Sequence, residues 1–399
     1  MDARTNRERL VFPDNFFWGT STAAAQIETA SDHNWRGIAA RDGSVLDRTT
    51  DHELRRDEDL TFIRQFGTVY RCSLDWARLQ PAYQAEFDEE AVAEYRDWLE
   101  ALREEGMRIM FVLHHFSHPR WLEEEGGWLN ERAIPAYVDF TCRCIKHFGD
   151  LISYWNTFNE PNVFAMNAYL RGEFPPFKRS YRKANRVLHH MGQAHDIAHE
   201  LIKDAFPEAP IGISFNTAWF DGHNALGQLA ARLADWWFHR YAARFFTKVD
   251  YWGLSYYAYV PFAPGPITEI DQPGRLDRLG IPHDRMWGYR PEGLGRQLRR
   301  FWRRYGKPII ITENGICTDD PQRRIQAIKD YLAVCHEAIS EGVPLQGYLF
   351  WSTIDNFEWQ LGHSYRFGLV RVDWPTMNRT MTPAGQFYAQ LTQDNALTV

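Results

Sequence analysis

Apolar and polar positions follow one repeated order along the chain, in which a short apolar run precedes an amphipathic stretch with a helical period. The short runs predict buried strands, and the amphipathic stretches predict the helices between them. Alternation of this kind predicts an α/β fold, and eight such units predict one closed (β/α)8 barrel, the TIM barrel. The strands are expected at residues 17–20, 69–73, 108–113, 152–158, 211–215, 252–256, 308–312 and 345–350.

Three of the predicted helices carry clear end signals. Asp88 and Asn130 are predicted N-caps, and Gly106, Gly149 and Gly342 are predicted to end their helices. Apolar residues recur with a helical period between these ends, so one face of each helix is expected to pack on the barrel. The predicted buried faces are Ala91, Tyr95, Trp98 and Leu102; Ile134, Val138, Thr141, Ile145 and Phe148; and Ile325, Ile328, Leu332, Cys335 and Ile339.

The chain shows no sign of a domain boundary. No Gly/Ser-rich or Pro-rich linker interrupts the repeated order, which predicts a single catalytic domain over residues 1–399. Residues 260–286 lack a clear pattern and are rich in Pro and Gly, so we expect a loop insertion over the barrel mouth. Such loops commonly shape access to a site.

Charge and terminal sequence narrow the classes of partner. The formal net charge of −7 argues against nucleic acid and against an anionic membrane, because both require a positive field. The N-terminus is polar, and no stretch approaches the length of an apolar membrane span, which predicts a soluble cytoplasmic protein. Five cysteines, an odd number, predict free thiols rather than a disulfide framework. The pattern does not predict the oligomeric state.

Two glutamates stand where the chemistry of such a barrel is expected. Active sites of α/β barrels lie at the carboxyl ends of the strands, and Glu160 and Glu313 follow the fourth and seventh predicted strands. Amide, imidazole, phenol and indole side chains follow other strands, without a Cys/His cluster, so no metal and no cofactor are expected. A carboxylate pair among such groups is typical of enzymes that hydrolyse glycosides.

These glutamates lie within motifs that resemble glycoside hydrolase family 1, from about residue 10 to residue 375. The two glutamate motifs, in this order and each after the matching strand, are the most specific part of the resemblance. The matching motifs are Phe12-Pro13 through Phe16-x-Trp18-Gly19 to Gln26-Ile27-Glu28, Tyr70-Arg71, Gly126-Gly127-Trp128, Thr157-Phe158-Asn159-Glu160-Pro161, Thr312-Glu313-Asn314-Gly315 and Asp355-Asn356-Phe357-Glu358-Trp359.

The resemblance implies retaining hydrolysis of terminal β-D-glycosides through a covalent glycosyl-enzyme. It implies that Glu313 is the nucleophile and Glu160 the acid/base, with Arg71 and Tyr257 keeping Glu313 ionised. Two carboxylates about 5 Å apart repel by roughly 3 kcal/mol, which favours one protonated and one ionised group. The residues implied to bind the sugar are Gln26, His115, Asn159, Trp351, Glu358 and Trp359, with Trp287 at the aglycone.

The implied substrate is a small neutral β-glycoside or oligosaccharide, such as a glucoside, galactoside or fucoside. A carboxylate at Glu358 is expected to repel a 6-phosphate. Three positions depart from the family: Ser255 replaces an Asn, Phe116 replaces a Trp, and residues 381–384 lack the usual Lys-x-Ser. Two alternatives therefore stay open: a transglycosidase that uses the same intermediate, and a weakly active sugar-binding protein.

Other conspicuous residues have simpler structural interpretations. His195 and His199 are spaced like metal ligands, but no third ligand is visible, so we expect a structural role. Cys72 is expected to be a buried small side chain, and His52 to belong to a structural segment. The helical tryptophans Trp236, Trp237 and Trp302 are expected to fill the core or pack between helices.

Overall fold

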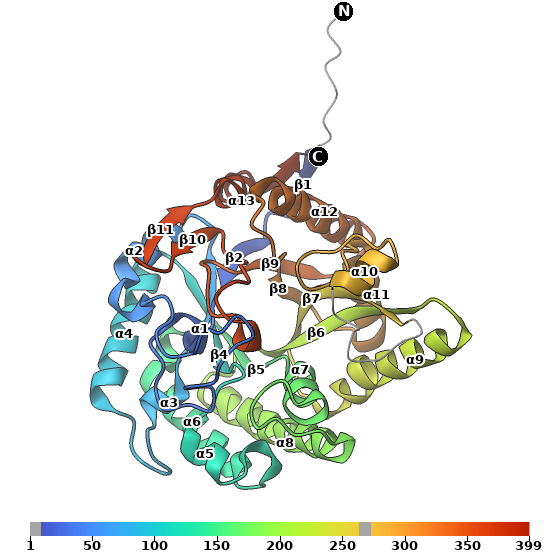
Figure 1. Cartoon of the computed structure of the whole chain (residues 1–399). Coiled ribbons are helices and arrows are strands. Elements are labelled where there is room, and N and C mark those ends of the chain that lie inside the picture. The colour runs from blue at the N-terminus through green and yellow to red at the C-terminus, as the bar shows by residue number, and fades with distance from the viewer. Residues whose placement is uncertain (1–8, 263–272, 399) are drawn as a thin grey trace, which may run out of the picture.

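The computed structural model describes residues 9–262 and 273–398 of the chain. Eight parallel strands close into a barrel in chain order, as the sequence predicts, and helices surround them (Figure 1). The barrel strands are β2 (Phe17–Ser21), β3 (Val69–Ser73), β4 (Arg108–His114), β5 (Tyr154–Asn159), β6 (Ile211–Gly222), β7 (Tyr251–Phe262), β8 (Ile309–Asn314) and β9 (Leu345–Trp351).

One long helix follows each barrel strand and packs on the outside of the barrel (Figure 1). Short helices lie in the connections, and two small antiparallel sheets complete the fold. The long helices are α2 (Arg56–Ile63), α4 (Glu89–Glu104), α6 (Ala133–Phe148), α8 (Tyr181–Ala205), α9 (Ala225–Asp235), α11 (Glu292–Tyr305), α12 (Pro321–Ser340) and α13 (Pro383–Asp394). The short ones are α1 (Ala24–Ile27), α3 (Trp76–Leu79), α5 (Arg120–Glu124), α7 (Pro161–Ala165) and α10 (Pro273–Arg278). The small sheets pair β1 (Arg9–Val11) with β12 (Ala396–Thr398) and β10 (Val370–Asp373) with β11 (Asn378–Met381).

The barrel interior is layered. Near the start of the strands, apolar side chains form a separate buried cluster that closes the bottom of the barrel. Above it lies a fully buried polar layer, whose members hydrogen-bond to one another across the strands. The apolar layer comprises Phe17, Val69, Met110, Tyr251, Ile310 and Leu349, and the polar layer includes Ser21, Arg71, Asn156, Ser214 and Thr312.

Two strands are much longer than the sequence predicts. β6 and β7 continue beyond the predicted ends at residues 215 and 256 to Gly222 and Phe262, and they stay paired to those last residues. The extension mixes polar and apolar residues, because it leaves the barrel and is no longer buried on both faces. The predicted loop at 260–286 is therefore only partly correct: 260–262 is strand and α10 is a helix, while 263–272 lies outside the described residues.

The helix predictions succeed in one case and need correction in another. In α4 the Asp88 side chain accepts the N–H of Ala91, and the predicted face is buried. Helix α6 begins at Ala133, so the prediction that Asn130 caps it is wrong; the Asn130 side chain instead accepts the N–H of Arg132 in the preceding turn. The buried face of α6 is also rotated from the predicted one, because the rings of Tyr137 and Phe140 fill the contact of this helix with the rest of the protein. Of the predicted face, Ile134, Val138 and Ile145 are only half-buried. The buried residues are Ala133, Ala136, Tyr137, Phe140, Thr141, Cys144 and Phe148.

Several single-residue predictions also have outcomes. In α12, Ile328, Leu332 and Cys335 are buried, whereas Ile325 and Ile339 are half-buried. All five cysteines are free. The expectation that Trp236 packs in the core is wrong: it is 44% exposed, because it lies on the outer face of the helix while Trp237 turns inward; Trp302 is half-buried.

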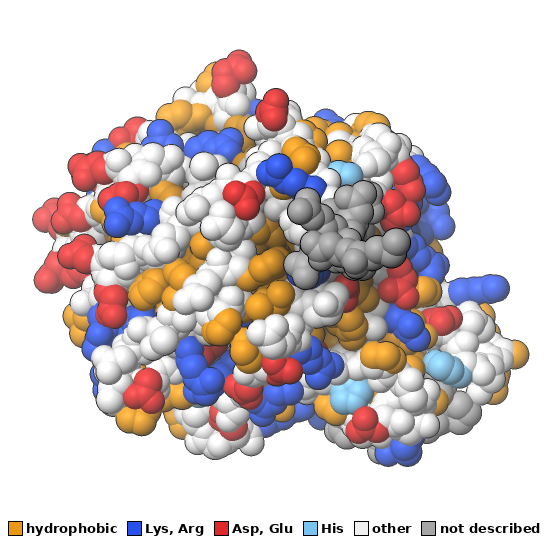
Figure 2. Space-filling model, turned by 90° about the horizontal axis from the view of Figure 1, so that it is seen from above, with side chains coloured by type: hydrophobic (Ala, Val, Ile, Leu, Met, Phe, Trp, Pro, Cys, Tyr) orange, Lys and Arg blue, Asp and Glu red, His pale blue; other side chains and the backbone are white. Residues whose placement is uncertain are grey.

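The described surface carries both signs of charge. Figure 2 shows acidic and basic side chains interspersed with apolar ones over one face. Among the described residues, no helix is both long enough and apolar enough to span a membrane. The expectations about nucleic acid, membranes and cellular location stay predictions.

Candidate active site

Arg71 links three strands at the centre of the barrel. Because side chains alternate along β3, Arg71 points inward one layer above Val69, and it is fully buried. Its Nη1 donates to Glu313 Oε1 at 2.6 Å. Its Nη2 donates to Asn159 Oδ1 at 2.6 Å and to Ser214 Oγ at 3.0 Å. The guanidinium therefore fixes the carboxylate of Glu313 in one orientation.

Glu313 enters the barrel because β8 breaks its regular alternation. The pairing of β8 with β9 shifts register beyond Ile311, and such irregularities re-aim side chains at the rims of barrels. The Tyr257 hydroxyl donates to Glu313 Oε2 at 3.1 Å, so each carboxylate oxygen accepts a hydrogen bond. Burial raises the pKa of Glu313 above its usual value, although Arg71 and Tyr257 oppose this shift and favour the ionised form.

The environment of Glu160, unlike that of Glu313, favours the protonated form of the carboxyl. It follows β5 directly at the start of α7, with a left-handed backbone of φ 42°, a strain that often marks functional residues. Its N–H donates to the Ser214 carbonyl at 2.8 Å, and Oε1 accepts from Asn216 Nδ2 at 2.8 Å. Burial, and then the charge of Glu313, raise the pKa of Glu160 to about 8. The two carboxyls are thus arranged to hold one proton on Glu160 at neutral pH.

Asn216 is a site residue that the sequence analysis missed. It lies in β6 immediately after the predicted end of that strand and is the described side chain that donates to Glu160. The signal is present in the sequence, because Asn216 is a polar residue directly after an apolar run, as are the predicted site residues at other strand ends. Its amide favours the ionised form of Glu160.

Two predicted sugar-binding residues have buried polar atoms that find no hydrogen-bond partner in the described part of the chain. Gln26 donates from Nε2 to Asn356 Oδ1 at 3.0 Å and to the Phe357 carbonyl at 2.9 Å, but its Oε1 is unpartnered. His115 accepts from Asn159 at 2.9 Å through Nε2, so the proton of the neutral ring is on Nδ1, which is also unpartnered. Leaving such a group unsatisfied costs about 1–3 kcal/mol, which a polar ligand at this position would offset.

The ring of His115 is uncharged in this setting. Burial, and then the nearby Arg71, hold the pKa of His115 well below its usual range. Asn159 lies between these two side chains and bonds to both, so it has one amide hydrogen left for a ligand. The main role of Asn159 is therefore to position Arg71 and His115, and only one of its hydrogens can contact a substrate.

The remaining predicted glycone residues come from the end of β9 and from the segment after it. Burial, and then the charges of Glu313 and Glu160, raise the pKa of Glu358 to about 8. Glu358 is thus mainly protonated at neutral pH, which weakens the expected repulsion of a phosphate by this side chain. The rings of Trp351 and Trp359 are buried and lie 5.8 Å and 6.3 Å from that of His115.

Trp287, the predicted aglycone residue, lies next to Tyr257, which donates a hydrogen bond to Glu313. The ring of Trp287 is 5.3 Å from that of Tyr257 and 6.3 Å from that of Phe367. The carboxylate of Asp284 fixes this segment, since it accepts the N–H groups of Trp287 and Cys317. Trp287 is half-buried and so keeps part of its surface free.

Two of the three departures from the family pattern, Ser255 and Phe116, fall at the carboxylate site. Ser255 pairs with Glu313 across β7 and β8, and its hydroxyl lowers the pKa of Glu160. Phe116 is buried against the rings of Trp359 and His115, so it forms an apolar wall where an indole could donate.

The residues with structural interpretations are placed away from the carboxyls. His195 bonds to Thr157 Oγ1 and to the Lys248 carbonyl, which occupies both ring nitrogens. His52 bonds to the buried Asp59. Burial raises the pKa of the Cys72 thiol to about 12. Within 9–262 and 273–398, no cluster of three or more His, Cys, Asp or Glu residues could hold a metal ion.

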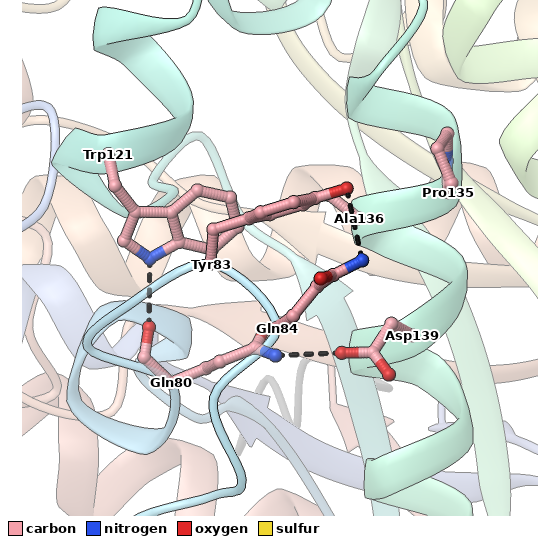
Figure 3. Close-up of a pocket in the computed structure, with 7 residues that line it drawn as sticks. All are labelled: Gln80, Tyr83, Gln84, Trp121, Pro135, Ala136 and Asp139. Carbon is pink, nitrogen blue, oxygen red and sulfur yellow. Dashed lines mark hydrogen bonds between the residues drawn. The ribbon is translucent and has the colours of Figure 1, made fainter.

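A second hollow, on the flank of the barrel between the segment after α3 and helices α5 and α6, is not the reaction site. Figure 3 shows that its polar groups bond to each other: Gln80 to Asp139 at 2.7 Å and the Trp121 indole to the Gln80 carbonyl at 3.0 Å. Neither glutamate lines this hollow.

Comparison with known proteins identifies the family. The model described as glycosyl hydrolase family 1 matches residues 8–261 and 242–397, nearly the whole chain. The chain belongs to glycosyl hydrolase family 1. This membership confirms the predicted family and the predicted enzyme class, an O-glycosyl hydrolase acting on β-glycosides.

Curated relatives of this family 1 chain carry matching names. Beta-glucosidase A of Thermotoga maritima is 28% identical, over 97% of this chain and 98% of the relative. A beta-galactosidase of Sulfolobus acidocaldarius is 31% identical, over 77% of this chain and 70% of the relative. The two names differ in the sugar, so they do not fix the glycone.

Solved structures confirm the barrel fold. A beta-glucosidase from Thermotoga maritima in complex with deoxynojirimycin superposes with a TM-score of 0.87 at 27% identity, covering 97% of this chain and 99% of that one. A beta-glycosidase from Pyrococcus horikoshii gives 0.87 at 28% identity, covering 98% and 97%.

Proposed function

We propose that this family 1 protein hydrolyses terminal β-D-glycosides with retention, with Glu313 as nucleophile and Glu160 as acid/base. The contrast between the two carboxyls carries the proposal. Glu313 accepts from Arg71 and Tyr257, whereas Glu160 has a pKa near 8 and, among the described residues, no hydrogen bond or ion pair with an arginine. One group is prepared to attack and the other to donate a proton.

The first step forms the glycosyl-enzyme. The Glu313 carboxylate attacks the anomeric carbon, the bond to the leaving oxygen breaks, and Glu160 gives its proton to that oxygen. Glu313 becomes an uncharged ester, which removes one cause of the raised pKa of Glu160. Glu160 then accepts a proton from water while the water oxygen attacks the anomeric carbon, and Glu313 leaves as a carboxylate.

The sugar would satisfy the unpartnered buried atoms. Gln26 Oε1 would accept from a hydroxyl, and His115 Nδ1–H would donate to one. Glu358, protonated at neutral pH, can donate and accept. Trp351 and Trp359 supply apolar surface for the ring, and Trp287 supplies it for the aglycone. The partner is thus a small β-glycoside or oligosaccharide, and the cytoplasmic location stays a prediction.

The transglycosidase alternative has one observation in its favour. Tyr257, Trp287 and Phe367 form an aromatic wall beside the nucleophile, and such a wall could hold an apolar acceptor alcohol in place of water. Addition of an acceptor would then yield new glycosides at the expense of free sugar. The sugar-binding alternative has no such support, since the contrast between the environments of the two carboxyls favours catalysis.

A panel of 4-nitrophenyl β-glycosides, including glucoside, galactoside and fucoside, tests the proposal. We expect release of 4-nitrophenol from at least one, and NMR should show the β-anomer of the sugar before it mutarotates. Initial formation of the α-anomer would contradict retention. No release from any of them between pH 5 and pH 8 would contradict hydrolysis of simple glycosides.

A further inference from the structure

A pocket outside the carboxylate site is built from basic groups. It is a cavity of about 180 Å³ between the start of α12, the start of α13, the β10–β11 sheet and the segment after β9. In the described structure, none of its lining residues hydrogen-bonds to Glu160 or Glu313. The residues that define its chemistry are Arg324, Arg366, Arg371, Asp355, Asp319 and Thr380.

The three arginines are not neutralised by the two acids. Arg366 donates to Asp355 at 2.5 Å, and Asp355 is further occupied by the N–H of Gly368. Asp319 is half exposed and pairs at 3.0 Å with Arg285, which does not line the pocket; Arg366 is farther from it, at 3.7 Å. The pocket therefore carries excess positive charge.

Two guanidinium groups in particular lack an acidic partner. Arg324 is 4% exposed and donates only to carbonyl oxygens, those of Gly368, Thr318 and Arg366, while its Nε–H has no partner. Arg371 is exposed on β10, and within the described residues its side chain has neither a hydrogen bond nor an ion pair. Asp355 and Asp319 attract the Arg324 guanidinium without bonding to it, so the cost of burying this cation is only partly offset, and an anion in the cavity would reduce that cost further.

The starts of two helices also lie at this cavity. The first residues of α12 and α13, Pro321 and Pro383, both line the pocket; the Asp320 carboxylate caps α12, whereas the neutral Thr382 caps α13, so α13 contributes the larger positive end. One wall includes Met381, Thr382 and Pro383, which belong to the segment that lacks the family's usual Lys-x-Ser. Among the described residues that line the cavity there is no aromatic ring, so they offer no surface for stacking a nucleoside base.

We propose that this pocket binds a small tetrahedral oxyanion, either inorganic phosphate or the phosphate of a small monoester. A water occupies about 30 Å³ of liquid, so a cavity of about 180 Å³ has room for such an ion with some water. The ion would link α12, the β10–β11 sheet and the segment after β9, which also carries Glu358. Binding should therefore stabilise the folded protein.

Calorimetric titration of the full chain with inorganic phosphate, at constant ionic strength with chloride as background, tests this proposal. We expect saturable binding and a rise in Tm that follows its occupancy. Arg371→Ala should weaken phosphate binding about tenfold, since a charge-assisted hydrogen bond is lost. Arg182→Ala removes an equally exposed arginine from α8 and should leave the affinity unchanged.

Each other outcome has a defined meaning. Absence of saturable binding to the wild type would overturn the proposal, and so would equal affinities of wild type and Arg371→Ala. An equal loss in Arg182→Ala would also overturn it, since the effect would then be one of overall charge. Tighter binding of glycerol 3-phosphate than of phosphate supports a monoester as occupant, and the reverse supports the free ion.

Discussion

Arg71 Nη1 lies 2.6 Å from Glu313 Oε1, and both side chains are buried in the barrel. The same guanidinium also holds Asn159 and Ser214, which ties the nucleophile's strand to those that carry Glu160 and Asn216. This one side chain therefore sets both the charge of Glu313 and its position relative to Glu160.

Arg71→Lys should keep the positive charge but lose the two-pronged guanidinium group, which donates hydrogen bonds to Glu313, Asn159 and Ser214. We expect kcat/KM to fall about 100-fold, since misplacement of a reacting group by about 1 Å has effects of this size. Arg108→Lys, at the opposite end of the barrel, is the matched control and should stay near wild type. If Arg71→Lys keeps activity within a few-fold while remaining folded by circular dichroism, positioning by Arg71 is contradicted.

Activity should decline as pH rises through about 8. Glu160 must be protonated to assist departure of the leaving group, and the proton is lost above its raised pKa. Asn216→Ala removes a hydrogen bond that favours the ionised form, so the alkaline limb of kcat/KM should move to higher pH. Hydrolysis of the glycosyl-enzyme should slow in the same variant, since it requires ionised Glu160. An unmoved limb would contradict the role of Asn216.

Glu160→Gln should be inactive with poor leaving groups yet more stable than the wild type at high pH. The folded pKa of Glu160 lies above its unfolded value, so ionisation opposes folding increasingly from about pH 4.5 to about pH 8. The Tm advantage of Glu160→Gln should thus be small at pH 4 and large at pH 9. Glu124→Gln, at an exposed position of α5, is the control. A Tm advantage that does not grow with pH would contradict the raised pKa.

The fold was largely predictable from the sequence. Each short apolar run predicts a buried parallel strand. The number of these runs and their alternation with helices predict the closed barrel. The extensions of β6 and β7 were not predictable, because beyond Thr217 and Tyr256 the two strands pair only with each other and lose the continuous apolar pattern. The same extension hid Asn216. The prediction of the buried face of α6 was wrong because the rings of Tyr137 and Phe140 are buried there.

The site was predictable in its residues but not in its contacts. Strand ends and motifs predict Glu160 and Glu313, whereas the hydrogen bonds of the Arg71 guanidinium depend on barrel closure and on register shifts in β5 and β8. The raised pKa of Glu358 follows from burial beside two other carboxyls, which no local pattern reveals.

Gln26→Ala should lower kcat/KM about 100-fold on the preferred glycoside, because the unpartnered Oε1 is proposed to accept a sugar hydroxyl. The loss should be small for the deoxy analogue that lacks this hydroxyl. Kinetics on the series of monodeoxy glycosides measure both quantities. Equal losses on every member of the series would mean that Gln26 acts on the fold of the site and not on one hydroxyl.

The most direct test of the central claim is azide rescue of Glu313→Ala, with Glu160→Ala as its counterpart. Loss of Glu313 should lower the rate on a 4-nitrophenyl glycoside by several orders of magnitude. Azide should then restore cleavage and give the α-glycosyl azide, because it enters from the side that the carboxylate occupied. Glu160→Ala should give the β-glycosyl azide. A β-glycosyl azide from Glu313→Ala, or full activity without azide, would contradict the assignment of Glu313 as nucleophile.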